Sequence, residues 1–196
     1  MADQVSSAKY ILYRLLIPAA CIFSNPIPKP KHNFIVVSHR GDHTHAPENT
    51  LAAYSNAIAA GADYVEIDLR TTADSQLVIM HDASVNRMTD DSGLIRNMTW
   101  EKLQTLTVRD RAHPEWGRQE IPLFTQVLDL CKGKIYVYLD FKSADPAAAW
   151  REIVKRGMEK EVISSGPAKM PAYGMQPSGK DCKDCRRIIR EILLTI

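Results

Sequence analysis

The sequence has no apolar run long enough to cross a membrane as a helix. A spanning helix needs about 20 consecutive apolar residues, and the run from Leu15 to Phe23 falls well short of that length. We therefore expect no integral membrane segment.

The sequence also has little net charge of either sign. Its formal charge is +2, and it contains no long run of lysine or arginine. A nucleic-acid partner would call for a strongly basic surface, so we expect none. A hydrophobic content of 45% with 24% charged residues is ordinary for a globular protein.

Cysteine is scarce, with four residues in 196. Cys21 and Cys131 are isolated, and only Cys182 and Cys185 form a CxxC pair. A structural zinc site usually needs a second ligand pair, and a thioredoxin-like site needs a preceding strand. The simpler interpretation of the pair is a surface dithiol or disulfide.

The N-terminus has some features of a secretory leader. Lys9 and Arg14 precede the apolar run at 15–23, whereas Asp3 and Pro18 are atypical of such a leader. The sequence favours neither export nor a cytoplasmic location. Three prolines then indicate an extended linker: Pro26, Pro28 and Pro30.

From residue 33 onward, strand-like runs alternate with helical ones. The predicted strands are Phe34–Ser38, Tyr64–Leu69, Gln76–Met80 and Lys134–Phe141. The predicted helices are Thr50–Ala60, Trp100–Leu106, Thr125–Cys131 and Pro146–Met158. Strands that alternate with helices indicate parallel pairing, and hence an α/β fold.

Carboxylates recur on one face of two predicted strands. Because side chains alternate along a strand, Glu66 and Asp68 point to the same face of 64–69. Asp140 and Lys142 share a face of the later strand in the same way. Parallel sheets place their active sites at the carboxyl ends of strands, so we expect these groups to meet there.

This set of side chains suits phosphodiester chemistry at a divalent cation. Hard carboxylate oxygens favour Ca²⁺ or Mg²⁺ over zinc. Arg40 and Lys142 are available to hold a phosphate. His39 and His81 each follow a predicted strand, and histidine is suited to proton transfer near neutral pH.

These residues resemble the glycerophosphodiester phosphodiesterases, relatives of the phosphatidylinositol-specific phospholipases C. The resemblance spans residues 33–158 and rests on two motifs: HRGDHTHAPENTLAAYSNAIAAGADYVEIDLRTTADSQLVIMHDASVNRMTDDSG and LDFK.

The resemblance implies a TIM barrel, (β/α)8, with one divalent cation bound to carboxylates. The implied ligands are Glu66, Asp68 and Asp140, and the implied catalytic pair is His39 and His81. The family usually has glutamate on the fourth strand, so the shorter Asp140 is a departure.

The implied reaction converts a small glycerophosphodiester into glycerol 3-phosphate and an alcohol. One histidine takes a proton from the attacking hydroxyl and the other protonates the departing alcohol, through a cyclic phosphate. Two alternatives remain open: a catalytically incompetent fragment of such an enzyme, or a related phosphodiesterase acting on phosphoinositides or sphingolipids.

The chain is short for a complete barrel, which takes about 250 residues. We expect three parts: a leader and linker at 1–32, a partial barrel at 33–160, and an irregular tail at 161–196. About the first half of the barrel would then be present. Its open strand edges would favour self-association.

Four polar residues near the motifs have simpler interpretations than metal binding. Glu48 is expected to favour the start of the helix that follows it. His43 and His45 are expected in a solvated loop, and Asp82 is expected to orient its loop or His81.

Overall fold

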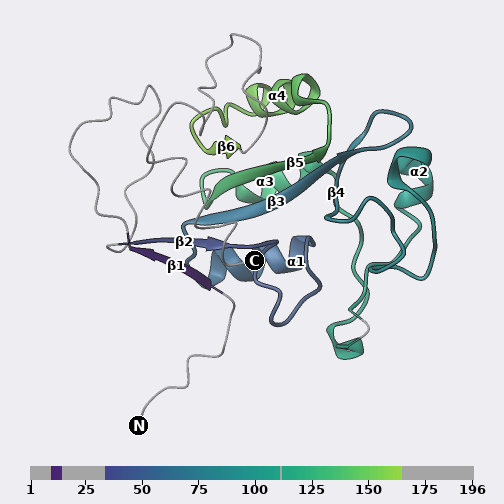
Figure 1. Cartoon of the computed structure of the whole chain (residues 1–196). Helices are drawn as coiled ribbons and strands as arrows, with labels where there is room; N and C mark the ends of the chain where they lie inside the picture. The colour runs from purple at the N-terminus through teal and green to yellow at the C-terminus, as the bar shows by residue number, and fades with distance from the viewer. Residues whose placement is uncertain (1–9, 15–33, 111, 165–196) are drawn as a thin grey trace.

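The computed structural model describes residues 10–14, 34–110 and 112–164 (Figure 1). Most of the predicted leader, the CxxC pair and most of the predicted tail lie outside these residues. Within them the strands are β1 Tyr10–Arg14, β2 Phe34–Ser38, β3 Tyr64–Thr71, β4 Leu77–Ile79, β5 Tyr136–Ser143 and β6 Val162–Ser164. The helices are α1 Leu51–Ala59, α2 Trp100–Leu103, α3 Phe124–Cys131 and α4 Pro146–Lys155, with short 3-10 turns η1 Ile95–Asn97 and η2 Pro114–Trp116.

The strands form one sheet in the order β1-β2-β3-β5-β6, with β4 paired to β3. The pairs β2–β3, β3–β5 and β5–β6 are parallel, as the alternation of strands and helices predicts. β1 comes from the segment expected to be a leader, and it pairs antiparallel with β2. The parallel strands with their connecting helices form part of a (β/α)8 barrel.

One face of the sheet is covered by helices α1, α3 and α4 (Figure 1). On β3 this face carries Val65, Ile67 and Leu69, which are fully buried against the helices. Each buried aliphatic side chain of this kind stabilises the fold by about 1.5–3 kcal/mol. The alternate residues Glu66 and Asp68 therefore lie on the opposite face.

Helix α1, at Leu51–Ala59, begins and ends within one residue of the predicted Thr50–Ala60. The Thr50 side chain accepts a hydrogen bond from the Ala53 N–H, which caps the first turn. The chain leaves the helix through Gly61, at φ +78°. Helix α2 ends at Leu103 rather than Leu106, and its first turn is capped by Thr99.

The prediction that all strands pair in parallel is wrong for β4. Only a short turn follows β3, and a parallel crossover needs a dozen or more residues. The chain instead reverses, so that Leu69 pairs with Ile79 and Thr71 with Leu77 in an antiparallel hairpin. The Met80 N–H then donates to the Asp68 carbonyl at 3.0 Å. This reversal returns the chain toward the carboxylates just before His81.

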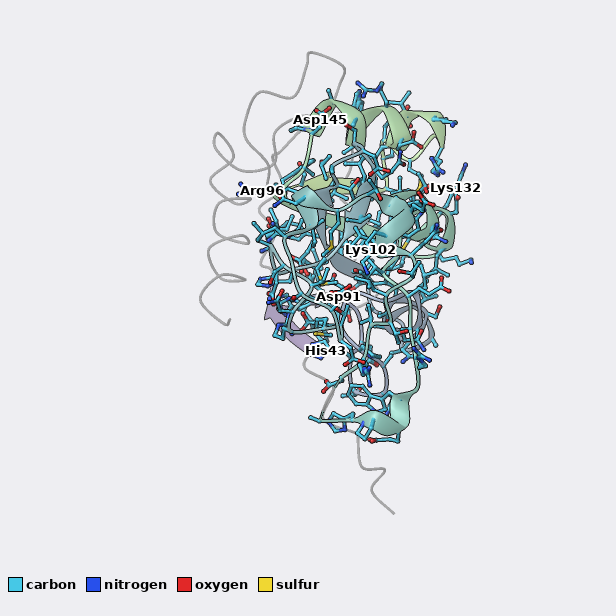
Figure 2. The ribbon with its side chains drawn as sticks, turned by 90° about the vertical axis from the view of Figure 1, so that its right-hand side faces the viewer. His43, Asp91, Arg96, Lys102, Lys132 and Asp145 are labelled. Carbon is cyan, nitrogen blue, oxygen red and sulfur yellow. The ribbon has the colours of Figure 1, made fainter. Side chains whose placement is uncertain are left out.

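The segment between β4 and α3 packs around a small core of its own, which includes Val85, Ile95 and Leu103. On its surface Lys102 pairs with Asp91 at 2.6 Å, and both side chains are labelled in Figure 2. Among the described residues, no helix combines the length and apolar character that crossing a bilayer requires.

Candidate active site

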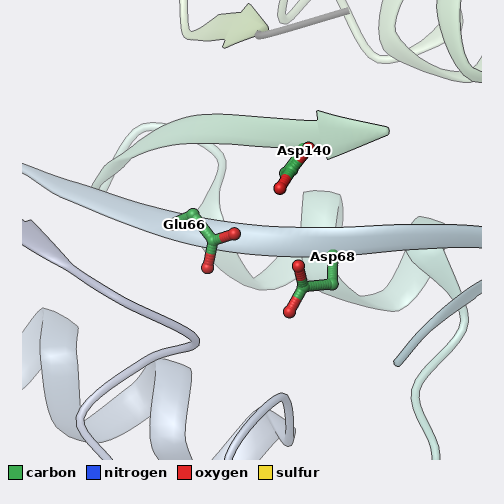
Figure 3. Close-up of side chains that lie close together, drawn as sticks. All are labelled: Glu66, Asp68 and Asp140. Atoms are coloured by element: carbon green, nitrogen blue, oxygen red, sulfur yellow. The ribbon is translucent and has the colours of Figure 1, made fainter. Parts of the chain in front are cut away.

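Three carboxylates converge on the face of the sheet away from the helices (Figure 3). Glu66 and Asp68 come from β3 and Asp140 from β5, where it is the direct register partner of Asp68. Each residue offers a potential ligand atom, and these three atoms lie within 4.8 Å of one another. The convergence of Glu66 and Asp68 is confirmed, and the strand register brings Asp140 to them.

Each carboxylate is oriented by a donor from the protein. The Arg40 backbone N–H donates to Glu66 Oε2 at 2.9 Å. The Lys142 ammonium donates to Asp140 Oδ2 at 2.7 Å and lies 3.2 Å from Asp68 Oδ1. Arg40 Nε lies 3.4 Å from Asp68 Oδ2. Both predicted phosphate-binding cations therefore already contact the carboxylate cluster.

The electrostatics of this cluster fit a divalent cation. Burial, followed by the negative charge of Asp68, raises the pKa of Glu66 well above its usual value. Asp68 is fully buried, and its Oδ1 lies 3.2 Å from the Lys142 ammonium without a well-aligned hydrogen bond in the described part of the chain. A bound cation would satisfy this oxygen more fully. An all-carboxylate donor set is the kind that Ca²⁺ and Mg²⁺ prefer.

Asp68 is also held from the side of helix α1. Asn49 Nδ2 donates to Asp68 Oδ2 at 2.8 Å, and the Tyr54 hydroxyl donates to Asn49 Oδ1 at 2.7 Å. Sequence reasoning missed both side chains, since Asn49 was a candidate helix cap and Tyr54 an apolar helix residue. The left-handed backbone of Asn49, at φ +57°, has no direct signal in the sequence.

His39 lies in the tight turn that follows β2. Arg40 and Gly41 both have positive φ, at +54° and +83°, which turns the Arg40 N–H toward Glu66. Burial, followed by the charge of Arg40, lowers the pKa of His39 to about 4. His39 is therefore neutral near pH 7 and can accept a proton.

His81 is fixed at both its backbone and its ring. Arg70 of β3 donates to the His81 carbonyl, through Nε at 3.1 Å and also through Nη2. The ring Nδ1 lies 2.8 Å from Asp82 Oδ1, which confirms that Asp82 orients the histidine. The hydrogen bond from Arg87 is the main cause that lowers the pKa of Asp82 to about 2. The ionised Asp82 therefore favours a proton on His81 Nδ1.

A chain of ion pairs links the two histidine loops. Arg87 bonds Asp82 at 2.7 Å and Glu48 at 2.5 Å, and Glu48 in turn pairs with Arg40 at 3.2 Å. Glu48 thus has partners beyond the helix start that the sequence suggested, and it bridges Arg40 and Arg87. The bridge relates the loop after β2 to the loop after β4.

A carboxylate cluster on the helix-free face of a parallel α/β sheet defines the class of protein: an α/β barrel. The three carboxylates lie inside β3 and β5, three or more residues before each strand ends, and not at the strand ends that the sequence predicted. The chain belongs to the glycerophosphoryl diester phosphodiesterase family, whose profile matches residues 39–191. The predicted family and barrel fold are confirmed.

Relatives and solved structures agree with this assignment. The chain is 34% identical over 110 residues to a glycerophosphodiester phosphodiesterase of Caldanaerobacter subterraneus, a match that covers 56% of this chain and 45% of the relative. It is 33% identical over 151 residues to glycerophosphodiester phosphodiesterase 1 of Mus musculus, covering 74% and 46%. The crystal structure of a glycerophosphodiester phosphodiesterase from Agrobacterium tumefaciens superposes with a TM-score of 0.63 at 33% identity, over 65% of this chain and 55% of that one.

The chain spans less than half the length of these curated relatives. A phosphodiesterase of Oleispira antarctica, at 23% identity, shares the fold with a TM-score of 0.61 over 80% of this chain and 71% of its own. The family match at residues 39–191 includes both histidine loops and the three carboxylates.

Proposed function

We propose that this chain hydrolyses small glycerophosphodiesters to glycerol 3-phosphate and an alcohol, at one bound Ca²⁺ or Mg²⁺. The observation that carries the proposal is the convergence of Glu66, Asp68 and Asp140 within 4.8 Å beside paired cationic side chains. Family membership supports the reaction type. The Oleispira antarctica relative was solved in complex with the product sn-glycerol-3-phosphate.

Glu66, Asp68 and Asp140 would hold the cation. When bound, the cation neutralises phosphate charge and lowers the pKa of the attacking glycerol hydroxyl. The ligand set fits because three carboxylate oxygens converge, and because the buried Asp68 Oδ1 has the Lys142 ammonium at 3.2 Å but no well-aligned hydrogen bond within the described part of the chain. The shorter Asp140 fits as well, since its place opposite Asp68 in the register brings its carboxylate to the cluster.

His39 is the proposed proton acceptor in the first step. Its pKa of about 4 leaves the ring neutral at pH 7, with a lone pair available for the hydroxyl proton. The hydroxyl oxygen then forms a bond to phosphorus, the bond to the departing alcohol breaks, and a cyclic phosphate results. In the second step water bonds to phosphorus, the ring bond from phosphorus to the glycerol hydroxyl oxygen breaks, and His39 returns its proton to that oxygen.

His81 is the proposed proton donor to the departing alcohol. Asp82 holds the proton on Nδ1, so the other ring nitrogen, Nε2, is the atom that exchanges protons with the substrate. In the second step the direction of proton transfer at His81 reverses, and its Nε2 accepts a proton from the attacking water. Asp82 stabilises the charged ring in both steps.

Arg40 and Lys142 are proposed to stabilise the phosphoryl oxygens. Both cations lie at the carboxylate cluster, at 3.4 Å and 3.2 Å from the two oxygens of Asp68. Donors placed where charge develops act most strongly in the transition state. Kinetics of Arg40→Ala with an unchanged kcat would remove this role for Arg40.

A phosphorus NMR time course with glycerophosphocholine tests the histidine assignments. His39→Gln and His81→Gln should each slow substrate loss by about 10²–10⁴-fold, the usual contribution of a general acid or base. His113→Gln is the matched control, because that histidine lies in an exposed loop. Wild-type rates in both site variants would contradict the proposal.

A second candidate function is that of a non-catalytic fragment that keeps the motifs. The observation that favours it is the partial barrel, since this chain covers only 45% of its Caldanaerobacter relative. Catalytic groups need a rigid scaffold to hold them in place. Cation binding without any turnover would support this second function.

A further inference from the structure

We propose that Asn49 is a positioning residue for the divalent-cation site and that Tyr54 sets its orientation. The proposal rests on the proposed function above, because it assumes that Asp68 is a cation ligand. Asn49 would hold one oxygen of Asp68 and thereby aim the other at the cation.

The three side chains form a buried relay from helix α1 to strand β3. Tyr54 and Asp68 have no exposed surface, and Asn49 is 3% exposed. The Tyr54 hydroxyl donates to Asn49 Oδ1 at 2.7 Å, and Asn49 Nδ2 donates to Asp68 Oδ2 at 2.8 Å. Because a phenol donates to the amide oxygen, the amide nitrogen must face the carboxylate. Tyr54 therefore determines which end of Asn49 contacts Asp68.

The backbone at Asn49 favours asparagine for a reason other than helix capping. Thr50 already caps helix α1, through the bond from Ala53 N–H to its hydroxyl. Asn49 instead lies at φ +57°, a left-handed conformation that asparagine tolerates better than most residues. Its N–H donates to the Arg40 carbonyl at 2.9 Å. The same residue thus joins the His39 loop to the carboxylate cluster.

A neutral donor has an advantage at this position. Asn49 donates to Asp68 Oδ2 without adding a positive charge to those of Arg40 and Lys142, which already lie beside this carboxylate. Asp68 Oδ1 is left buried and, among the described residues, without a hydrogen bond, although Lys142 Nζ lies 3.2 Å away. Partners that orient metal ligands commonly account for a 10–100-fold difference in metal affinity.

Calcium titration calorimetry on the chelator-treated full chain tests the relay. Asn49→Gly removes the amide and still accepts positive φ, so it should weaken Ca²⁺ binding by about 10–100-fold. Tyr54→Phe removes only the hydroxyl, so it should also weaken Ca²⁺ binding, but less than Asn49→Gly does. Asn97→Gly, at an exposed asparagine, is the matched control and should bind Ca²⁺ as the wild type does.

The thermal melt of each metal-free variant separates positioning from folding. A purely structural role would lower the melting temperature and leave the dissociation constant, measured well below the melt, unchanged. If Asn49→Gly does not fold, Tyr54→Phe decides: weaker Ca²⁺ binding supports the relay, and wild-type binding overturns it. Wild-type binding in both folded variants also overturns it.

The wild-type titration keeps the two proposals distinguishable. If the wild-type chain binds neither Ca²⁺ nor Mg²⁺, the cation site of the proposed function is wrong and the relay is wrong with it. If the wild type binds and the relay variants bind equally well, only the relay is wrong.

Discussion

At the scale of single residues, the site combines two histidines with different surroundings. His39 is half-buried beside a cation, whereas His81 is hydrogen-bonded to an ionised aspartate. These surroundings keep the His39 ring neutral at pH 7 and hold a proton on His81 Nδ1, which fits proton acceptance by His39 and donation by His81, while the low pKa makes His39 a weak base.

The first prediction concerns the titration of His39. Its imidazole should titrate near pH 4, because burial and the charge of Arg40 disfavour the protonated ring. The unfolded chain takes up this proton near pH 6.5, so His39 should lower the free energy of unfolding as pH falls from about 6.5 to 4. Histidine NMR, assigned with His39→Gln, measures the titration. A midpoint near 6.5 would show that the ring is exposed.

A second prediction concerns Asp82. Asp82→Asn removes the charge that holds the proton on His81 Nδ1, and it also removes an ion pair to Arg87. A general acid or base contributes roughly 10²–10⁴-fold to the rate, and Asp82 supports only part of that effect. We therefore expect kcat to fall by about tenfold or more, with little change in KM.

Steady-state kinetics with glycerophosphocholine measure this effect. The matched control is Asp91→Asn, which breaks the peripheral ion pair to Lys102 and should leave kcat unchanged. An unchanged kcat in Asp82→Asn would exclude a role for this carboxylate in catalysis.

At the scale of secondary-structure elements, the turn after β2 depends on Gly41. Its φ is +83°, and an added Cβ would lie 2.8 Å from backbone and side-chain atoms of Ala53 in helix α1. The Asp42 N–H also donates to the Ala53 carbonyl at 2.9 Å. The close approach of turn and helix is therefore specific to glycine.

A third prediction compares two glycine substitutions. Gly133 also has positive φ, at +68°, but an added Cβ there would meet no atom within 4 Å. Gly133→Ala should reduce the free energy of unfolding by about 1–2 kcal/mol, the cost of a left-handed alanine. Gly41→Ala should cost about 1–3 kcal/mol more, because the clash with Ala53 adds to that strain. Urea denaturation measures both, and equal losses would contradict the close packing at Gly41.

The sequence predicted the elements of the site better than their pairing. The period of two in β3 was enough to place Glu66 and Asp68 together, because this rule depends only on neighbouring residues. The antiparallel turn into β4 was missed, although the five residues between the strands are too few for a crossover. The Asn49–Asp68 contact could not be predicted, since it depends on how helix α1 packs against β3.

At the scale of the whole molecule, the described part of the sheet has β6 as its last strand. Within the described residues, β6 lies at the end of the strand order and pairs only with β5. Exposed strand edges are templates for pairing with another chain. The barrel sheet was predictable from the motifs, whereas the strand β1 beside β2 was not.

A fourth prediction concerns self-association through this edge. The sedimentation coefficient of the purified chain should rise with protein concentration. Ile163→Lys places a charge on β6, at a half-buried isoleucine packed against the cluster of Tyr64 and Tyr138, and should reduce the association of a chain that still melts cooperatively. Val154→Lys, at an exposed valine of helix α4, is the control and should leave it unchanged. A single monomeric species with one cooperative melt would contradict the prediction.

The most direct measurement of the central claim is the release of glycerol 3-phosphate from glycerophosphocholine by the purified chain. We expect turnover with added Ca²⁺ or Mg²⁺, none with chelator, and a loss of turnover in Glu66→Gln but not in Glu101→Gln, which changes a glutamate on the exposed side of helix α2. No release under any of these conditions, from a folded chain, would contradict the claim that this part of the barrel carries the chemistry.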